Sequence, residues 1–66
     1  MNPVKQAIMK YANGLIGDSD FFEVLHEIFN QDNESGREST LAFYNDTKAL
    51  VREGISLGDI LHGVLG

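Results

Sequence analysis

The sequence predicts an all-α fold, a compact bundle of four short helices at about 3–15, 20–30, 36–53 and 57–65. Three observations support this prediction: apolar residues recur at helical spacing in four successive segments, residues that favour helix ends flank these segments, and no alternating strand pattern occurs. The connections are short, which favours antiparallel neighbours. A chain of 66 residues forms at most one domain, so we expect residues 1–66 to fold as a single small helical domain.

The first helix is predicted at 3–15, directly after a favourable N-terminal pair. Asparagine is a good N-cap residue and proline is favoured at the first helical position, so Asn2 and Pro3 mark its start. Its apolar face consists of Val4, Ala7, Ile8, Tyr11 and Leu15. Gly17 is expected just beyond the end of the helix, because glycine tolerates the left-handed backbone that ends many helices.

The second helix holds three of the four phenylalanines and is expected to be the centre of the fold. Its apolar residues fill an arc of roughly 160°, wider than the ordinary amphipathic stripe of ~100°. They are Phe21, Phe22, Val24, Leu25, Ile28 and Phe29. A helix with so wide an apolar face must contact more than one neighbour. Asp20 and Glu23 resemble a capping box at its start, and the helix is expected to end near Asn30.

The third helix, at about 36–53, is predicted from a second capping pattern that Ser35 and Glu38 form. Its apolar side is expected to consist of Leu41, Phe43, Tyr44, Thr47, Leu50 and Val51. Gly54 follows the last periodic residue and is expected to end this helix as a left-handed glycine.

The fourth helix is short, and Ser56 and Asp59 are its predicted capping pair. Its apolar face consists of Leu57, Ile60, Leu61, Val64 and Leu65. Gly58 and Gly63 each lower its intrinsic stability by about 1 kcal/mol relative to alanine. We therefore expect this helix to form only where it docks on an apolar surface, either of the same chain or of a second copy.

The charge of the chain is −5 in total and unevenly distributed. Residues 18–38 carry seven acids and only Arg37 as a base, a net charge of −6, whereas residues 1–17 carry Lys5, Lys10 and no acid. This acidic segment argues against direct nucleic-acid binding, which depends on Lys and Arg side chains that meet phosphates. It suits a basic protein partner, and the alternative is a solvated face that only aids solubility.

The sequence predicts no enzyme activity, no cofactor and no metal. There is no cysteine, and the serines have neither a nucleophile elbow nor a glycine-rich phosphate loop around them. Glu23 with His26, and Asp59 with His62, have the spacing of metal ligands in helical bundles. Both pairs fall on polar helix faces, so we expect exposed histidines instead. Residues 31–42 lack the first carboxylate and the final glutamate of an EF-hand loop.

The sequence also gives an expectation for cellular location. The first residues show no basic region followed by an apolar one, as a secretory signal would have. No apolar run approaches the ~18 residues that span a bilayer. Together with the absence of cysteine, these features favour a cytoplasmic protein that does not enter a membrane.

Two segments resemble helices of known families. Asn33–Tyr44 resembles the third-helix region of the Hha/YmoA modulators of nucleoid proteins, which are also short four-helix chains. The charged segment that follows in that family is replaced here by residues 45–48, Asn-Asp-Thr-Lys. Asp20–Asp32 is similar in pattern to a helix of the colicin immunity proteins, acidic helical inhibitors whose Tyr-Tyr-Pro motif is absent here. Both resemblances imply a role exerted through protein contacts.

These observations lead to three hypotheses. The first is a non-enzymatic interaction protein of bacterial or phage type, an inhibitor or modulator whose candidate contacts with a partner are Asp20, Glu23, Glu27, Asp32, Glu34 and Glu38. The second is a helical homo-oligomer, such as a homodimer, with an interface formed by Phe22, Phe29, Leu57, Leu61 and Leu65. The third is a modulator of a nucleoid protein, of the Hha kind.

Overall fold

A computed structural model describes residues 2–29 and 32–65 of the chain. The chain forms four helices, α1 (Pro3–Ala12), α2 (Asp18–Ile28), α3 (Glu34–Arg52) and α4 (Leu57–Leu65). No strand occurs in the described ranges, and the predicted all-α bundle is confirmed. The predicted fourth helix has the observed bounds, and the predicted first helix is three residues too long. Asn30, the predicted end of the second helix, lies outside the described residues.

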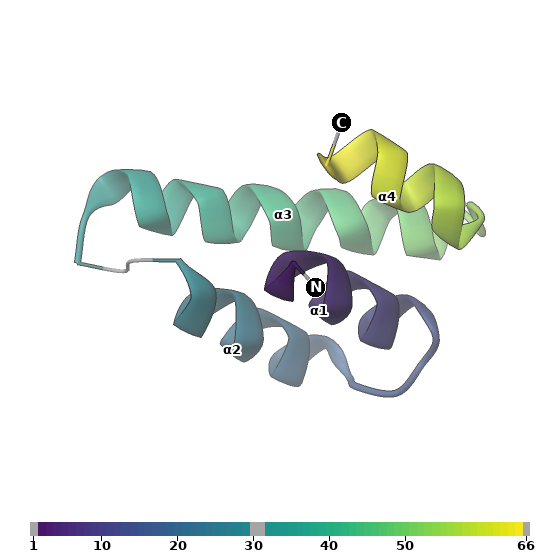
Figure 1. Ribbon diagram of the computed structural model, residues 1–66, viewed down its shortest axis with the longest axis horizontal. Coiled ribbons are helices and arrows are strands. Elements are labelled where there is room, and N and C mark those ends of the chain that lie inside the picture. Colours follow the sequence, from purple (N-terminus) through teal and green to yellow (C-terminus); the bar gives the residue numbers. More distant parts are fainter. Residues whose placement is uncertain (1, 30–31, 66) are drawn as a thin grey trace.

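Successive helices run antiparallel to one another (Figure 1). α1 packs against α2 and α4, and α3 packs against the same two helices. α3 has 19 residues, about twice the length of α1 or α4, and extends along the whole molecule. The radius of gyration is 11.1 Å, close to the ~11 Å expected for a compact chain of this length.

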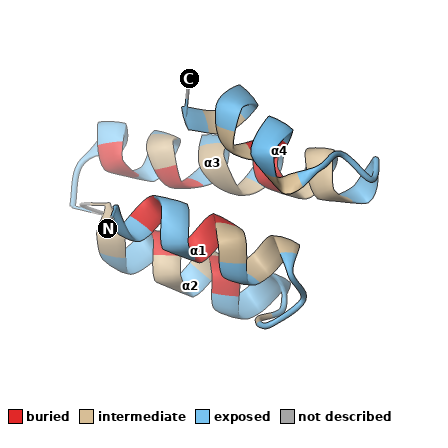
Figure 2. Ribbon diagram, turned by 45° about the vertical axis from the view of Figure 1, so that its right-hand side comes forward, coloured by how far each residue is buried: buried red, intermediate tan, exposed pale blue. Residues whose placement is uncertain are grey.

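The core is formed mainly where α1 and α2 face each other, and α4 closes it from the other side (Figure 2). Its buried apolar residues are Val4, Ala7, Ile8, Phe21, Leu25 and Ile60. α3 contributes no buried large apolar side chain from its described residues, but it buries the side chains of Thr40 and Thr47. Half-buried aromatic and aliphatic residues of α3 then surround this centre. The phenylalanine-rich α2 is thus central to the core, as predicted.

Two residues that were predicted on an apolar face are more than half exposed. Leu41 is 51% exposed, because Thr40, one residue earlier and 100° away on α3, points inward in its place. Leu15 is 72% exposed, because α1 ends three residues before it and the chain turns away from the core.

The ends of α1 differ in how well the sequence predicts them. Asn2 caps the start as expected, since its Oδ1 accepts a hydrogen bond from the Val4 N–H at 2.9 Å. At the other end, Gly14 rather than Gly17 has the left-handed backbone, with a φ of +75°. The Leu15 N–H donates to the Lys10 carbonyl, and the Gly14 N–H donates to that of Tyr11. This double pairing is a Schellman motif, and it ends the helix at Ala12.

The predicted caps of α2 and α3 are wrong. α2 begins at Asp18 after Gly17, with no side-chain cap, so Asp20 is inside the first turn and favours the helix dipole instead of capping. α3 is capped by Asn33, whose Oδ1 accepts from the Gly36 N–H at 2.7 Å, and the predicted capping residue Ser35 already lies within the helix. Asparagine is as good an N-cap as serine, so the earlier of two competent residues caps the helix here.

The predicted boundary between α3 and α4 is confirmed. Gly54 has a φ of +77°, and the Ile55 N–H donates to the Leu50 carbonyl in a second Schellman motif. Ser56 and Asp59 then form the expected capping pair: the Asp59 N–H lies 3.4 Å from Ser56 Oγ, which donates to the Asp59 carboxylate at 3.0 Å.

Candidate protein-binding surface

Three carboxylates lie on the outer side of α2, and we call them the acidic stripe: Asp20, Glu23 and Glu27. At 100° per residue they fall within an arc of roughly 60°, on the side opposite Phe21 and Leu25. All three are exposed, and none pairs with a cation among the described residues. The stripe therefore presents negative charge directly to solvent.

Asp18, the fourth acid of α2, has a different environment. The Tyr11 hydroxyl donates a hydrogen bond of 2.6 Å to its carboxylate, and Lys48 Nζ lies 3.9 Å from the other carboxylate oxygen. Lys48 also donates to the Tyr44 hydroxyl at 3.2 Å and lies 4.6 Å from the centre of that ring. Asp18 is thus part of a network that joins α1, α2 and α3, and Lys48 partly offsets its charge.

This network also affects Tyr11 itself. Partial burial, the hydrogen bond to Asp18 and the negative charge of that carboxylate together raise the pKa of Tyr11 from 10.0 to about 12. Tyr11 is consequently a neutral hydrogen-bond donor throughout the physiological range. Its ring stacks on Phe21 with the centroids 4.5 Å apart, so the side chain holds α1 to α2.

The remaining predicted contacts are exposed but lie on other elements. Asp32 is in the turn between α2 and α3. Glu34 and Glu38 are on the first turns of α3, about 120–180° around the helix from the buried threonines. The six predicted acids are therefore divided between the outer sides of two helices and a turn. The acidic stripe is the largest subset that shares one side of one helix.

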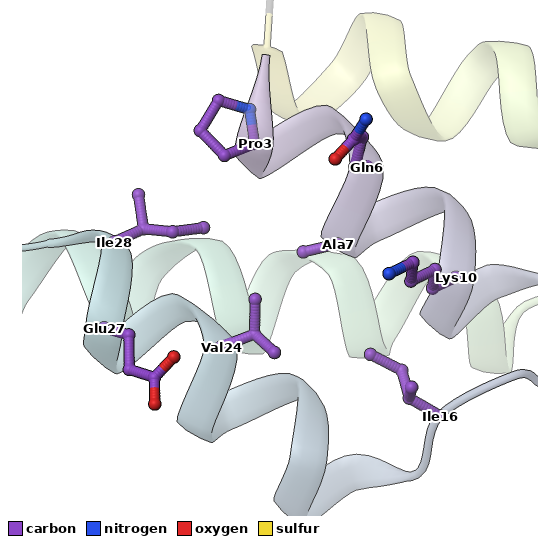
Figure 3. Close-up of a pocket in the computed structure, with 8 residues that line it drawn as sticks. All are labelled: Pro3, Gln6, Ala7, Lys10, Ile16, Val24, Glu27 and Ile28. Carbon is purple, nitrogen blue, oxygen red and sulfur yellow. The ribbon is translucent and has the colours of Figure 1, made fainter. Parts of the chain in front are cut away.

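A groove of about 260 Å³ lies between α1 and α2, beside the acidic stripe (Figure 3). Ala7 and Val24 point toward each other from the two helices, and Ile28 and Ile16 lie toward opposite ends. The other lining residues are Pro3, Gln6, Lys10 and Glu27. We call this feature the α1–α2 groove. Its interior is apolar, while Lys10 is on one wall and Glu27 on the other.

A second hollow of about 270 Å³ lies on the far side of Gln6 and Lys10, which line both. Met9, Asn13 and the exposed Leu15 complete it. Each hollow is smaller than the ~300–1,000 Å³ of typical small-molecule pockets. Their dimensions suit one or two apolar side chains of another macromolecule.

Neither the α1–α2 groove nor the second hollow was predicted from the sequence. Ala7 and Ile28 were predicted as apolar-face residues, but which of them border an open hollow depends on the spacing of the two packed helices. Lys10 is exposed on α1, and its charge lies on one wall of the α1–α2 groove.

The histidines and possible metal ligands have the predicted exposure. His26 and His62 are exposed on α2 and α4. Across residues 2–29 and 32–65, no three His, Cys, Asp or Glu side chains come close enough to hold a metal ion.

Most residues predicted for self-association pack within their own chain. Phe22 forms a T-shaped contact with Tyr44, with ring centroids 5.0 Å apart, and Phe29 stacks on Phe43 with centroids 5.3 Å apart. Leu57 and Leu61 are half-buried. Leu65, at the end of α4, is 37% exposed and is the most accessible of the five.

The comparisons with known proteins identify no relative: no family model, no curated protein and no solved structure matches this chain. In the part of the chain that the structure describes, no helix has both the length and the apolar character needed to cross a membrane. The function is therefore argued from the charge and shape of the surface.

Proposed function

We propose that this chain is a non-enzymatic protein-interaction module that binds a basic protein partner through the acidic stripe. One observation supports the proposal most directly: Asp20, Glu23 and Glu27 are exposed on one side of α2 without a cation among the described residues, whereas Asp18 on the same helix is satisfied internally. Such a partner would be occluded or modulated at its basic site.

Charge complementarity between two proteins acts mainly on how fast they associate. Opposite charges steer two proteins together and raise the association rate and the specificity more than the final affinity. The stripe extends over eight residues of helix, with about 10 Å between its ends, which matches a compact basic patch or one side of a basic helix.

The experiment that tests the proposal compares two charge-neutralised variants. The first carries Asp20→Asn, Glu23→Gln and Glu27→Gln, and the control removes three exposed acids elsewhere: Glu34→Gln, Glu38→Gln and Asp46→Asn. Both change the net charge by the same amount. After affinity capture from the native host, the stripe variant should associate with the captured partner about tenfold more slowly, and the control should keep most of the original rate. Binding that is unchanged between low and high ionic strength would contradict the proposal.

Self-association through α4 is a second candidate, and a separate observation favours it. All nine residues of α4 are described, and Ile60 is the only buried one although the helix has five large apolar side chains. Three of them are half-buried, and Leu65 is exposed. Sedimentation at micromolar concentrations tests this candidate: a dimer that Leu65→Gln dissociates would support it, and a strict monomer would remove it.

A further inference from the structure

We propose that the α1–α2 groove binds a basic amphipathic helix of the partner, with its apolar side chains over Ala7 and Val24 and its Lys or Arg side chains over the acidic stripe. This inference rests on the proposed function and adds the structural class of the partner segment. The walls, the size and the charges of the groove each support it.

The walls of the groove favour a helix as the occupant. α1 and α2 are antiparallel neighbours, and the groove follows one side of each, with Pro3, Ala7 and Lys10 on α1 and Val24 and Ile28 on α2. These spacings of three, four and seven residues form a continuous ridge along each helix. A third helix can place its own ridge between them, as in other complexes where an amphipathic helix occupies an apolar groove.

The size of the groove fixes how many side chains enter it. The volume of about 260 Å³ is too small for an aromatic cluster or a typical ligand, and it suits two neighbouring aliphatic anchors. α1 has ten residues and is about 15 Å long, so about three turns of a partner helix lie alongside it. Anchors at positions i and i+4, or i and i+3, would both reach the floor.

The charges fix the orientation of the occupant. Glu27 lines the α2 wall and belongs to the acidic stripe, whose other members lie one and two turns earlier on α2. Lys10 is on the opposite wall, where a cation of the partner would be repelled. A helix with Lys or Arg along one edge of its apolar ridge, and neutral or acidic residues along the other edge, satisfies both walls. A second copy of this chain fits less well, because its net charge of −5 opposes association.

The test uses three labelled synthetic peptides of about 15 residues, enough for four helical turns. The first has leucines at i, i+3, i+4 and i+7 with lysines along one edge. The second has the same composition in an order that gives no apolar face, and the third has serine in place of each leucine. Binding to the 66-residue chain is measured by fluorescence anisotropy. Amide chemical shifts of the unmodified protein then locate the contact without depending on the folding of any variant.

The first peptide should bind at least about tenfold more tightly than the other two, with the largest shifts at Ala7, Ile16 and Ile28. Val24→Thr, which keeps the side-chain shape but makes the floor polar, should weaken binding about tenfold. Val51→Thr is the matched control, because Val51 is also half-buried but lies on α3 and does not line the groove. It should leave the affinity unchanged.

Each result discriminates between the groove and the stripe. Equal binding of the first and third peptides, or shifts confined to Asp20, Glu23 and Glu27, would overturn binding in the groove while the acidic stripe still stands. Shifts confined to α3 and α4 would overturn both. If neutralising the stripe leaves the affinity of the first peptide unchanged, the proposed function is contradicted. The same result would contradict the preference of the groove for a helix with basic residues along one edge. Absence of binding by the first peptide up to about 1 mM would overturn the inference outright.

Discussion

Two buried threonines of α3 differ in whether their hydroxyl groups have hydrogen-bond partners. Thr40 and Thr47 are seven residues apart on the inward side of the helix, and they are 1% and 0% exposed. The Thr40 hydroxyl donates to the Gly36 carbonyl at 3.0 Å, the usual pairing for a threonine inside a helix. The Thr47 hydroxyl has no hydrogen-bond partner among the described residues. A buried hydroxyl without a partner loses its hydration and gains nothing in return.

We therefore predict that Thr47→Val raises the free energy of unfolding by about 1 kcal/mol, because valine has the same shape and needs no partner. Thr40→Val is the matched control, with the same burial and the same helix propensity class, and it gives up a hydrogen bond worth about 1 kcal/mol. Urea unfolding of both variants measures the difference. Equal effects of the two substitutions would mean that the Thr47 hydroxyl is satisfied in solution.

Tyr11 gives a prediction for alkaline pH. Its pKa in the folded chain is about 12, against 10.0 for an ordinary tyrosine. Between these two values the folded state retains a proton that the unfolded state loses, so the stability contributed by Tyr11 is complete below pH 10 and disappears as the pH rises toward 12. Tyr11→Phe should remove this part of the alkaline destabilisation. The absorbance titration of the parent chain minus that of Tyr11→Phe should have its midpoint near the raised pKa.

A second substitution tests the cause of the shift. Asp18→Asn removes both the charge and the strong acceptor while keeping the shape, so the pKa of Tyr11 should fall toward its ordinary value. An unchanged midpoint in Asp18→Asn would assign the shift to burial alone.

At the scale of whole elements, the sequence predicts which segments are helical much better than where each helix starts and ends. The wide apolar face of α2 and most of the periodic residues of α1 and α4 depend only on local spacing, and they were predicted correctly. Leu15 was not, because α1 ends before it. Gly14 and Gly17 are both suitable for a left-handed helix end, and Asn33 and Ser35 are both suitable N-caps. Only the packing of the neighbouring helices selects Gly14 and Asn33, so local patterns leave these boundaries open.

α4 gives a prediction at the same scale. A β-carbon added at Gly63 would lie 3.6 Å from the Leu50 Cδ1, an ordinary van der Waals contact. Gly63→Ala should therefore raise the free energy of unfolding by about 1 kcal/mol, from the better helix propensity of alanine. Gly54→Ala is the opposite case, because Gly54 has a φ of +77°, and it should destabilise the chain. Thermal unfolding of the two variants checks both signs, and a destabilised Gly63→Ala would indicate that α4 packs more tightly against α3 than these contacts show.

At the scale of the whole molecule, the candidate surface is less predictable than the fold. The exposure of Asp20, Glu23 and Glu27 follows from their position opposite the apolar face, so the acidic stripe is already present in the sequence pattern. The α1–α2 groove is not, because it depends on how closely two helices pack around Ala7 and Val24. The sequence also does not show that Asp18, unlike the stripe residues, has partners in the fold, because Tyr11 and Lys48 come from other helices.

The acidic stripe also has a cost for the fold, and this cost can be measured. Glu23 is three residues from Asp20 and four from Glu27, and like charges at these helical spacings are destabilising. Glu23→Gln relieves both repulsions and should raise the free energy of unfolding by about 0.5 kcal/mol at low ionic strength. The gain should shrink at high salt, because screening already weakens the repulsion in the parent chain. A surface that binds a basic partner would thus trade stability for binding: the same substitution should stabilise the free chain and weaken its complex. If Glu23→Gln destabilises the free chain instead, Glu23 has a structural partner and the stripe is part of the fold rather than a surface kept for binding.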